Sequence, residues 1–219
     1  MPETLDRVDQ QLALINRYAT HPVTLLVVPG KPWRAGDLDR LRDWIRRGHR
    51  LAGHGWTHRA GSIRGLRHRL HSRLISRDCA EHLALSGRQI QALMRRCRGW
   101  FATNKLPLPE RYVPPAWALG RIDGPALRAT GFELVETLTG FIDLSTGRYH
   151  RAALVGFEAV DRWQLPAIRV SNAINRLLAR RWPLRIALHP DDHRLGLADD
   201  LLRELAQVAR HDIWTMPIR

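Results

Sequence analysis

Two histidines four residues apart, His54 and His58, are the side chains of this sequence best suited to hold a metal ion. Imidazole nitrogens are good ligands for zinc and similar divalent ions. A spacing of four places both rings on one side of a turn, and the flanking glycines let the backbone bend there. The spacing alone is a weak signal, since His189 and His193 repeat it. The position of His54 and His58 after a short strand favours a metal site over two solvated histidines.

A second segment, His189-Pro-Asp191-Asp192, directly follows the apolar run 184–188. A histidine with carboxylates nearby can be held in one tautomer and can act as a general acid. We therefore expect His189 to be catalytic together with a carboxylate, assigned here to Asp191, with Asp192 as the alternative. The competing interpretation is a proline turn whose aspartates cap the next helix.

The third segment is Tyr112-Val-Pro-Pro-Ala-Trp117. Prolines and an aromatic ring form a rigid wall that suits a pocket for a sugar ring or an acyl group. We expect Pro115, Trp117 and Trp56 to bind substrate. Considered alone, this segment is better explained by core and turn packing, and only the two histidine segments favour the pocket.

All three segments share one arrangement, a short apolar strand that breaks into polar or proline-bearing residues at its end. In barrels and doubly wound sheets the active site forms at such strand ends, so the three loops are expected to meet. Strand-like and helix-like stretches alternate, which predicts an α/β domain with a largely parallel sheet or barrel. Asp37 is expected to be the N-cap of the helix 37–47 and Gly48 its C-terminal glycine. The expected helices cover residues 3–19, 37–47, 77–101, 124–130, 169–181 and 198–210; strands or extended segments cover 23–28, 50–54, 112–117, 132–138, 184–188 and 213–216, with a hairpin over 141–150.

Composition indicates a soluble globular protein, and the 219 residues suit one domain, taken as 1–219. No apolar run is long enough for a membrane span, and the first residues lack the features of a signal peptide, so we expect a cytoplasmic protein with no membrane partner. Cys79 and Cys97 are expected to be small buried residues in a reducing compartment.

The net charge of +14 invites a nucleic-acid reading. We do not expect nucleic acid as the main ligand, because the basic residues are spread over most segments rather than clustered. All but two of them are arginines, which can reflect codon composition.

Taken together, the segments resemble the NodB-like polysaccharide deacetylases, the fourth family of carbohydrate esterases, and most closely a branch of short bacterial members. The resemblance covers nearly the whole chain: the run Val23–Pro29, then His54-Gly-Trp-Thr-His58, Tyr112–Trp117 and Leu188-His-Pro-Asp191, in that order. It implies a distorted (β/α) barrel of about seven strands. The family's first strand, which ends in an aspartate, is missing from this chain.

The resemblance also implies a mechanism. A divalent metal, usually zinc, polarises the carbonyl of an acetyl group on a sugar and activates a water. His54 and His58 would be ligands and His189 the acid that protonates the leaving group. The family's aspartate ligand would lie upstream of Met1 or has been lost, and Val113 stands where an arginine usually orients the base.

Three functions follow from these patterns. The leading one is a metal-dependent hydrolase acting on an acylated sugar or polysaccharide. The first alternative, supported by the missing aspartate and by Val113, is a non-catalytic relative that binds a carbohydrate or metabolite. The second is an arginine-rich nucleic-acid binder.

Overall fold

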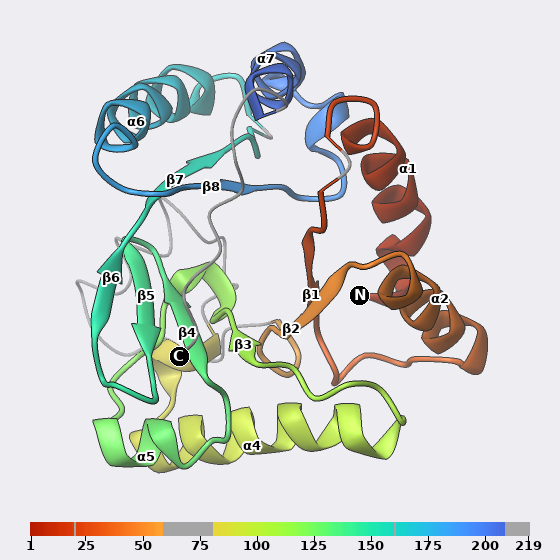
Figure 1. Ribbon diagram of the computed structural model, residues 1–219, viewed down its shortest axis with the longest axis vertical. Coiled ribbons are helices and arrows are strands. Elements are labelled where there is room, and N and C mark those ends of the chain that lie inside the picture. Colours follow the sequence, from red (N-terminus) through yellow and green to blue (C-terminus); the bar gives the residue numbers. More distant parts are fainter. Residues whose placement is uncertain (20, 59–80, 160, 209–219) are drawn as a thin grey trace. The chain divides into compact units, whose positions relative to one another are not determined.

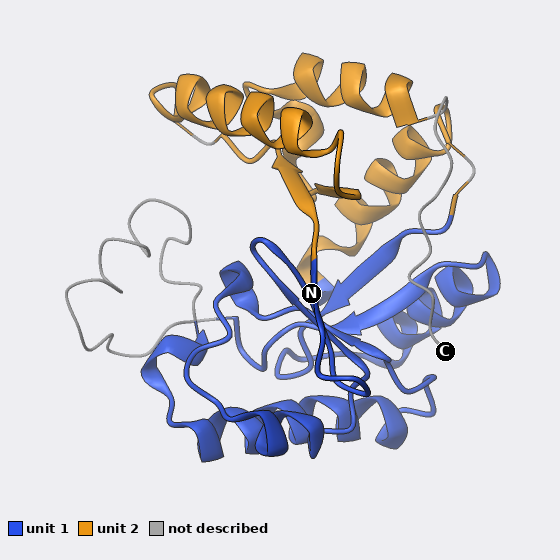
Figure 2. Ribbon diagram, turned by 60° about the vertical axis from the view of Figure 1, so that its left-hand side comes forward, with its two compact units in different colours: residues 1–2, 22–150 blue, residues 3–21, 151–219 orange. Residues whose placement is uncertain are grey.

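The computed structural model describes residues 1–19, 21–58, 81–159 and 161–208 (Figure 1). The chain divides into two compact units (Figure 2). Unit 1 comprises Met1–Pro2 and Pro22–His150, and unit 2 comprises Glu3–His21 and Arg151–Arg219. That the whole chain is one domain stays a prediction.

Unit 1 is built on a six-stranded sheet in the order β1 to β6. The first four strands are parallel neighbours, and β5 turns back antiparallel to β4. Their bounds are β1 Thr24–Val27, β2 Arg50–Gly53, β3 Arg111–Tyr112, β4 Leu134–Thr137, β5 Gly140–Asp143 and β6 Tyr149–Arg151. Because Gly53 pairs with both Val27 and Tyr112, the residues that follow β2 and β3 lie side by side at the carboxyl-terminal ends of these parallel strands.

Helix α4 (Gly87–Thr103) packs on this sheet through residues at helical spacing. Ile90, Met94, Cys97 and Phe101 are all fully buried, three or four residues apart, and so form one apolar stripe. A Cβ on Gly53 would lie 2.8 Å from the Cys97 sulfur, so a glycine at the end of β2 allows this close approach. Unit 1 also holds α2 (Ala35–Arg46), α5 (Gly124–Arg128) and the 3-10 turns η3 (Glu81–Ala84) and η4 (Pro115–Trp117).

Unit 2 has a parallel pair of strands, β7 (Ala153–Gly156) and β8 (Leu184–Ala187). Its helices are α1 (Leu5–Ile15), α6 (Gln164–Leu178) and α7 (Ala198–Val208). The 3-10 turn η1 (Pro2–Thr4) leads into α1, and the 3-10 turn η5 (Asp192–Arg194) lies between β8 and α7. Leu201 and Leu205 of α7 are buried at a spacing of four, as an amphipathic helix requires. None of the helices in the described ranges is long and apolar enough to cross a membrane.

The predicted fold class is confirmed as far as a mixed α/β architecture with a mostly parallel sheet. Every expected helix and strand within the described residues has a counterpart, including the hairpin formed by β5 and β6. Closure of the strands into one barrel stays a prediction. The expected strand 213–216 and Cys79 lie outside the described residues, whereas Cys97 is buried with a free thiol, as expected.

Three local predictions were wrong. Residues 115–117 are not extended: they form a 3-10 turn in which Ala116 and Trp117 have positive φ angles of 54° and 53°. Asp37 is not the N-cap of its helix, which is Arg34; it is the third residue of the first turn, and its carboxylate accepts the Arg34 N–H. Within the described part of the predicted helix 77–101, residues 81–84 form the separate turn η3, and the helix α4 begins at Gly87. The strand β7 was not predicted at all.

Candidate metal and substrate site

The imidazoles of His54 and His58 converge at the end of β2. The backbone N–H of His54 continues the parallel ladder by donating to the Val27 carbonyl at 2.9 Å. Its ring Nδ1 lies 2.7 Å from the carbonyl oxygen of Val113. Because a carbonyl can only accept, the proton of a neutral His54 ring is on Nδ1, which leaves a lone pair on Nε2. That Nε2 atom lies 3.0 Å from Nε2 of His58.

This pair fits two ligands of a single divalent ion. Histidine nitrogens bind zinc at about 2.0–2.1 Å, so two nitrogens 3.0 Å apart can reach one ion. A carbonyl that holds the far ring nitrogen is the usual partner of a metal-binding histidine. Within the described ranges, no group of three or more His, Cys, Asp or Glu side chains could hold a metal. Among the described residues these two histidines are the candidate ligands, and their metal binding stays a prediction.

The loop that carries the two histidines is tightly bent. Gly55 has a φ of +67°, and His58 has a φ of 58°, which a side chain with a Cβ rarely adopts. A Cβ on Gly55 would lie 2.7 Å from both the Glu81 carboxylate and the Pro115 ring. The loop therefore needs glycine at position 55, and something must hold His58 in its unfavourable conformation.

Glu81, a residue that the sequence analysis did not single out, supplies that restraint. Its carboxylate accepts the backbone N–H groups of Trp56 (2.9 Å), Thr57 (3.2 Å) and His58 (3.3 Å). It also accepts the Thr57 hydroxyl at 3.1 Å. One anion thus gathers three successive amides, and charge-assisted bonds of this kind are the stronger ones. Glu81 holds the bend from which His58 projects.

A buried chain of hydrogen bonds supports the other side of the loop. The Gly55 N–H donates to the Tyr112 hydroxyl at 3.2 Å, and that hydroxyl lies 2.7 Å from Nε2 of His82. The Nδ1 atom of His82 lies 3.1 Å from the Leu119 carbonyl, so Nδ1 carries the proton and Nε2 accepts from the tyrosine. Burial lowers the pKa of His82, which keeps the ring neutral, and burial raises the pKa of Tyr112. This histidine is structural, and it too was missed from the sequence.

Of the three predicted substrate-binding residues, Trp56 is part of this loop and Pro115 packs against it. Pro115 is buried against Gly55, and the indole N–H of Trp117 donates to Glu136 at 3.0 Å. The ring of Trp56 has the guanidinium of Arg96 3.8 Å from its centroid, in a cation–π contact. These contacts account for their positions by packing, and their role in binding a substrate stays a prediction.

His189 belongs to unit 2, where it follows β8. Its Nε2 lies 3.4 Å from the Glu158 carboxylate and its Nδ1 lies 3.9 Å from Asp192. The side chain is about half exposed. An imidazole flanked by carboxylates and open to solvent has the surroundings expected of a proton donor. Its predicted catalytic role stays a prediction.

Asp192, rather than Asp191, is the aspartate next to His189. Its side chain is fully buried and accepts the His189 N–H at 2.8 Å. Burial raises the pKa of Asp192 from 3.8 to about 6, and the nearby His189 opposes part of that rise. Asp191 instead pairs with Arg7 at 2.5 Å. The geometry thus favours the second of the two aspartates that the sequence left open.

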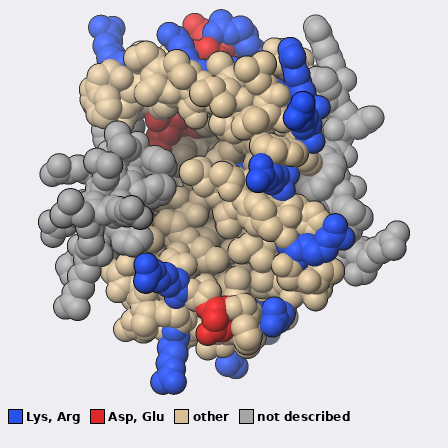
Figure 3. Space-filling view, turned by 90° about the vertical axis from the view of Figure 1, so that its left-hand side faces the viewer, with Lys and Arg blue, Asp and Glu red and all other residues tan. Residues whose placement is uncertain are grey.

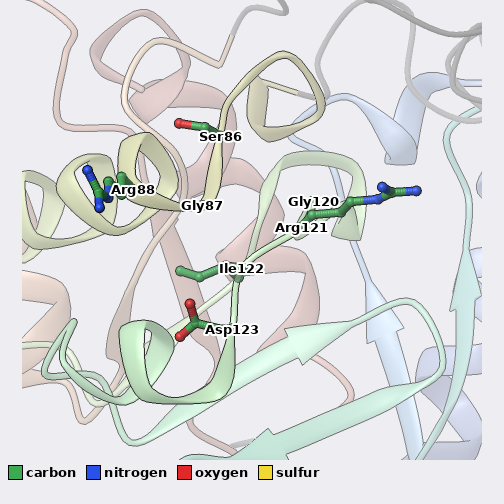
Figure 4. Close-up of a pocket in the computed structure, with 7 residues that line it drawn as sticks. All are labelled: Ser86, Gly87, Arg88, Gly120, Arg121, Ile122 and Asp123. Carbon is green, nitrogen blue, oxygen red and sulfur yellow. The ribbon is translucent and has the colours of Figure 1, made fainter.

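An open surface pocket of about 670 Å³ lies elsewhere in unit 1, where α4 and α5 begin (Figure 4). Ser86 and Asp123 cap these helices by accepting backbone N–H groups of their first turns. In Figure 4 the side chains of Arg88 and Arg121 point in opposite directions, so they do not converge on one ligand. No predicted site residue lines this pocket, and we assign it no catalytic role. Its lining consists of Ser86, Gly87, Arg88, Gly120, Arg121, Ile122 and Asp123.

Solved structures similar to this chain include a candidate polysaccharide deacetylase from Mycobacterium smegmatis. It aligns over 95% of this chain and 71% of its own, with 16% identity and a TM-score of 0.56. The Xyl-CE4 domain of a multidomain xylanase from the hindgut metagenome of Trinervitermes trinervoides aligns over 94% of this chain and 75% of its own, with 13% identity and a TM-score of 0.48. No sequence family and no curated protein sequence matches the chain. The first likeness confirms the expected NodB-like deacetylase fold, and at such low identity it shows the fold alone.

Proposed function

We propose that this protein is a metal-dependent hydrolase that removes an acetyl or other acyl group from an amino sugar or polysaccharide. The observation that carries the proposal is the convergence of the His54 and His58 Nε2 atoms at a strand end, with the His54 tautomer set by the Val113 carbonyl. The deacetylase-type fold supports it.

His54 and His58 would hold the ion, for which zinc suits the nitrogen ligands. A bound zinc would supply a Lewis acid for the acyl carbonyl and an acidified water. The protein's own part is to keep the two Nε2 atoms close together, through the Val113 carbonyl on one ring and Glu81 on the loop of the other. His189 is our proposed proton donor to the leaving amine or alcohol, with Asp192 rather than Asp191 as its supporting carboxylate.

Metal analysis of the purified protein tests the metal half of the proposal. We expect about one zinc per chain after loading and removal of excess metal, and its loss in His54→Ala and in His58→Ala. His150→Ala, which changes a histidine of unit 1 outside the site, is the matched control. Equal zinc content in the wild-type protein and in all three variants would show that His54 and His58 do not bind the metal.

Turnover is tested separately with short oligomers of N-acetylglucosamine. We expect acetate release by the zinc-loaded protein and a large loss in His189→Ala with its zinc retained. If zinc binds and the oligomers bind without any acetate release, the non-catalytic relative is the better description. One observation favours that second function: the Val113 side chain is apolar and buried, so it cannot orient a base as an arginine would.

A cytoplasmic location and the exclusion of nucleic acid as the main ligand stay predictions. A steep loss of RNA or DNA binding with salt, starting from nanomolar affinity, would be needed to favour the nucleic-acid reading.

A further inference from the structure

Helix α6 (Gln164–Leu178) of unit 2 turns an apolar face to the outside. Trp163, just before it, is 65% exposed, and within it Val170, Ile174 and Leu177 are 60%, 53% and 60% exposed. At 100° per residue these three helix positions fall within about 60° of one another, so they form one stripe. Leu178 is exposed at its edge. Exposed apolar side chains that gather on one face mark an interaction site more often than singly scattered ones do.

The inward side of α6 explains why this face points outward. Asn172 is buried opposite the stripe, where its amide accepts the Gly156 N–H at 3.1 Å and donates to the Gly156 carbonyl at 2.8 Å. Asn175 accepts the Leu154 N–H at 3.0 Å. Two asparagines thus bind the backbone of β7 and fix which face of α6 packs against that strand. The apolar stripe is therefore not used in the described packing of unit 2.

The segment that contains the stripe carries basic but no acidic residues of its own. From position 162 to position 190 the sequence has no aspartate or glutamate. Arg169 and Arg176 lie on the side of α6 that faces α7, where they pair with Asp200 and Glu204. Three further arginines are exposed at the two ends of the helix, at positions 162, 180 and 181. Figure 3 views the molecule from the side on which α6 lies and shows a mostly uncharged surface with several basic side chains and a few acidic ones.

We propose that α6 docks on the surface of an anionic membrane. A helix with an apolar face that includes tryptophan and leucine, flanked by arginines, is the composition of helices that lie in the lipid headgroup region. Arginines near the surface add electrostatic attraction to anionic lipids. A second copy of the chain fits less well, because it would bring the exposed Arg162, Arg180 and Arg181 toward the same like charges.

This inference is independent of the proposed hydrolase activity. It revises the expectation of no membrane partner, which rested on the absence of a spanning segment, whereas a helix that lies on a surface needs no span.

Co-sedimentation of the full chain with vesicles tests the proposal. We expect binding to vesicles of equimolar phosphatidylcholine and phosphatidylglycerol, and little binding to phosphatidylcholine alone. The double variant Ile174→Gln/Leu177→Gln should lower the partition coefficient about tenfold or more, because two side chains lose their apolar burial. Its matched control is Leu108→Gln/Leu138→Gln, which changes two exposed leucines of unit 1.

The charge contribution is tested by Arg180→Gln/Arg181→Gln. We expect a loss of about fivefold for each arginine removed. Arg46→Gln/Arg47→Gln removes the same net charge from exposed positions at the end of α2 and should have a much smaller effect. Circular dichroism and thermal unfolding check that the variants fold. If Ile174→Gln/Leu177→Gln does not fold, Arg180→Gln/Arg181→Gln still tests the proposal.

Two results would overturn the proposal. Equal losses in the α6 variants and in their matched controls would mean that a highly basic protein binds anionic vesicles non-specifically. Absence of vesicle binding, together with a concentration-dependent dimer that Ile174→Gln/Leu177→Gln abolishes, would assign the face to a second copy.

Discussion

Replacing Glu81 by alanine is the sharpest test of how the histidine loop is held. The carboxylate of Glu81 accepts three successive backbone N–H groups, the last being that of His58. His58 has a φ of 58°. Without the anion the loop loses its common acceptor, and His58 is expected to relax toward an ordinary backbone conformation. Its Nε2 would then no longer lie 3.0 Å from that of His54.

The magnitude follows from these contacts. A hydrogen bond to a charged group contributes about 1.5–3 kcal/mol, and the loop is partly exposed, so water replaces part of three such bonds. We expect Glu81→Ala to lower the free energy of unfolding by about 2–4 kcal/mol. Loss of a residue that orients a metal ligand commonly lowers metal affinity about 10- to 100-fold, and we expect a zinc affinity reduced by that factor. Glu81→Gln keeps one acceptor oxygen, so its free energy of unfolding and its zinc affinity should lie between those of wild type and Glu81→Ala.

Two assays separate the local effect from general destabilisation. Hydrogen exchange measures the protection of the Trp56, Thr57 and His58 amides without any metal, and it should fall in Glu81→Ala. Zinc affinity is measured by competition with a chromogenic chelator. Glu110→Ala, at an exposed position of unit 1, is the matched control. Unchanged amide protection in Glu81→Ala would refute the reasoning, and zinc affinity equal to wild type would refute its link to the metal.

Three further predictions concern stability. Because the pKa of Asp192 rises from 3.8 to about 6 on folding, the native state binds the extra proton, so the free energy of unfolding should fall as pH rises from about 4 to about 6. Asp192→Asn should remove that loss and stabilise the protein at pH 7 by about 2–3 kcal/mol, at about 1.4 kcal/mol per pKa unit, measured by denaturant unfolding at several pH values. Tyr112→Phe removes the acceptor of the buried Gly55 N–H and leaves a histidine nitrogen unpaired, which should cost about 2–4 kcal/mol in chemical denaturation. Gly30→Ala places a Cβ 2.4 Å from the Trp56 carbonyl oxygen, so the loop must shift, and we expect a loss of about 1–3 kcal/mol in thermal unfolding.

Each of these predictions has an outcome that contradicts it. A pH profile that is the same for Asp192→Asn and wild type would mean that this carboxyl does not carry the pH dependence. Tyr112→Phe should be compared with Tyr149→Phe, whose ring is 47% exposed, and equal stability of the two variants would argue against the buried chain of hydrogen bonds. For Gly30, the control is Gly36→Ala within α2, where a Cβ meets no neighbouring atom, and a comparable loss there would remove the steric argument.

Much of the architecture could be predicted from the sequence because it depends on local patterns. The stripe of Ile90, Met94 and Cys97 has helical spacing, and the run 23–28 is apolar and β-rich, so a helix and a strand were expected where α4 and β1 lie. The strand β7 was missed because nothing in its four residues is distinctive. Its backbone is satisfied by β8 and by two asparagines of α6, which are partners distant in the sequence.

The candidate site divides in the same way. His54 and His58 could be identified because both residue type and spacing are local. The residues that hold them could not. Glu81 lies more than twenty positions away and reads as an ordinary acidic residue, and the pairing of His82 with Tyr112 spans thirty positions. The sequence could not decide between Asp191 and Asp192 either, because only the structure shows which of them is buried beside His189.

The sequence by itself determined most of the order of strands and helices, the histidine pair and the basic, arginine-rich character of the chain, because periodicity, spacing and charge are properties of neighbouring residues. Tertiary structure alone decided which atoms face one another: the Val113 carbonyl that sets the His54 tautomer, the Glu81 carboxylate that bends the loop, and the asparagines that turn the apolar face of α6 outward. Hydrogen bonds reach only about 3 Å, and partners so far apart in the sequence meet only when strands and helices pack.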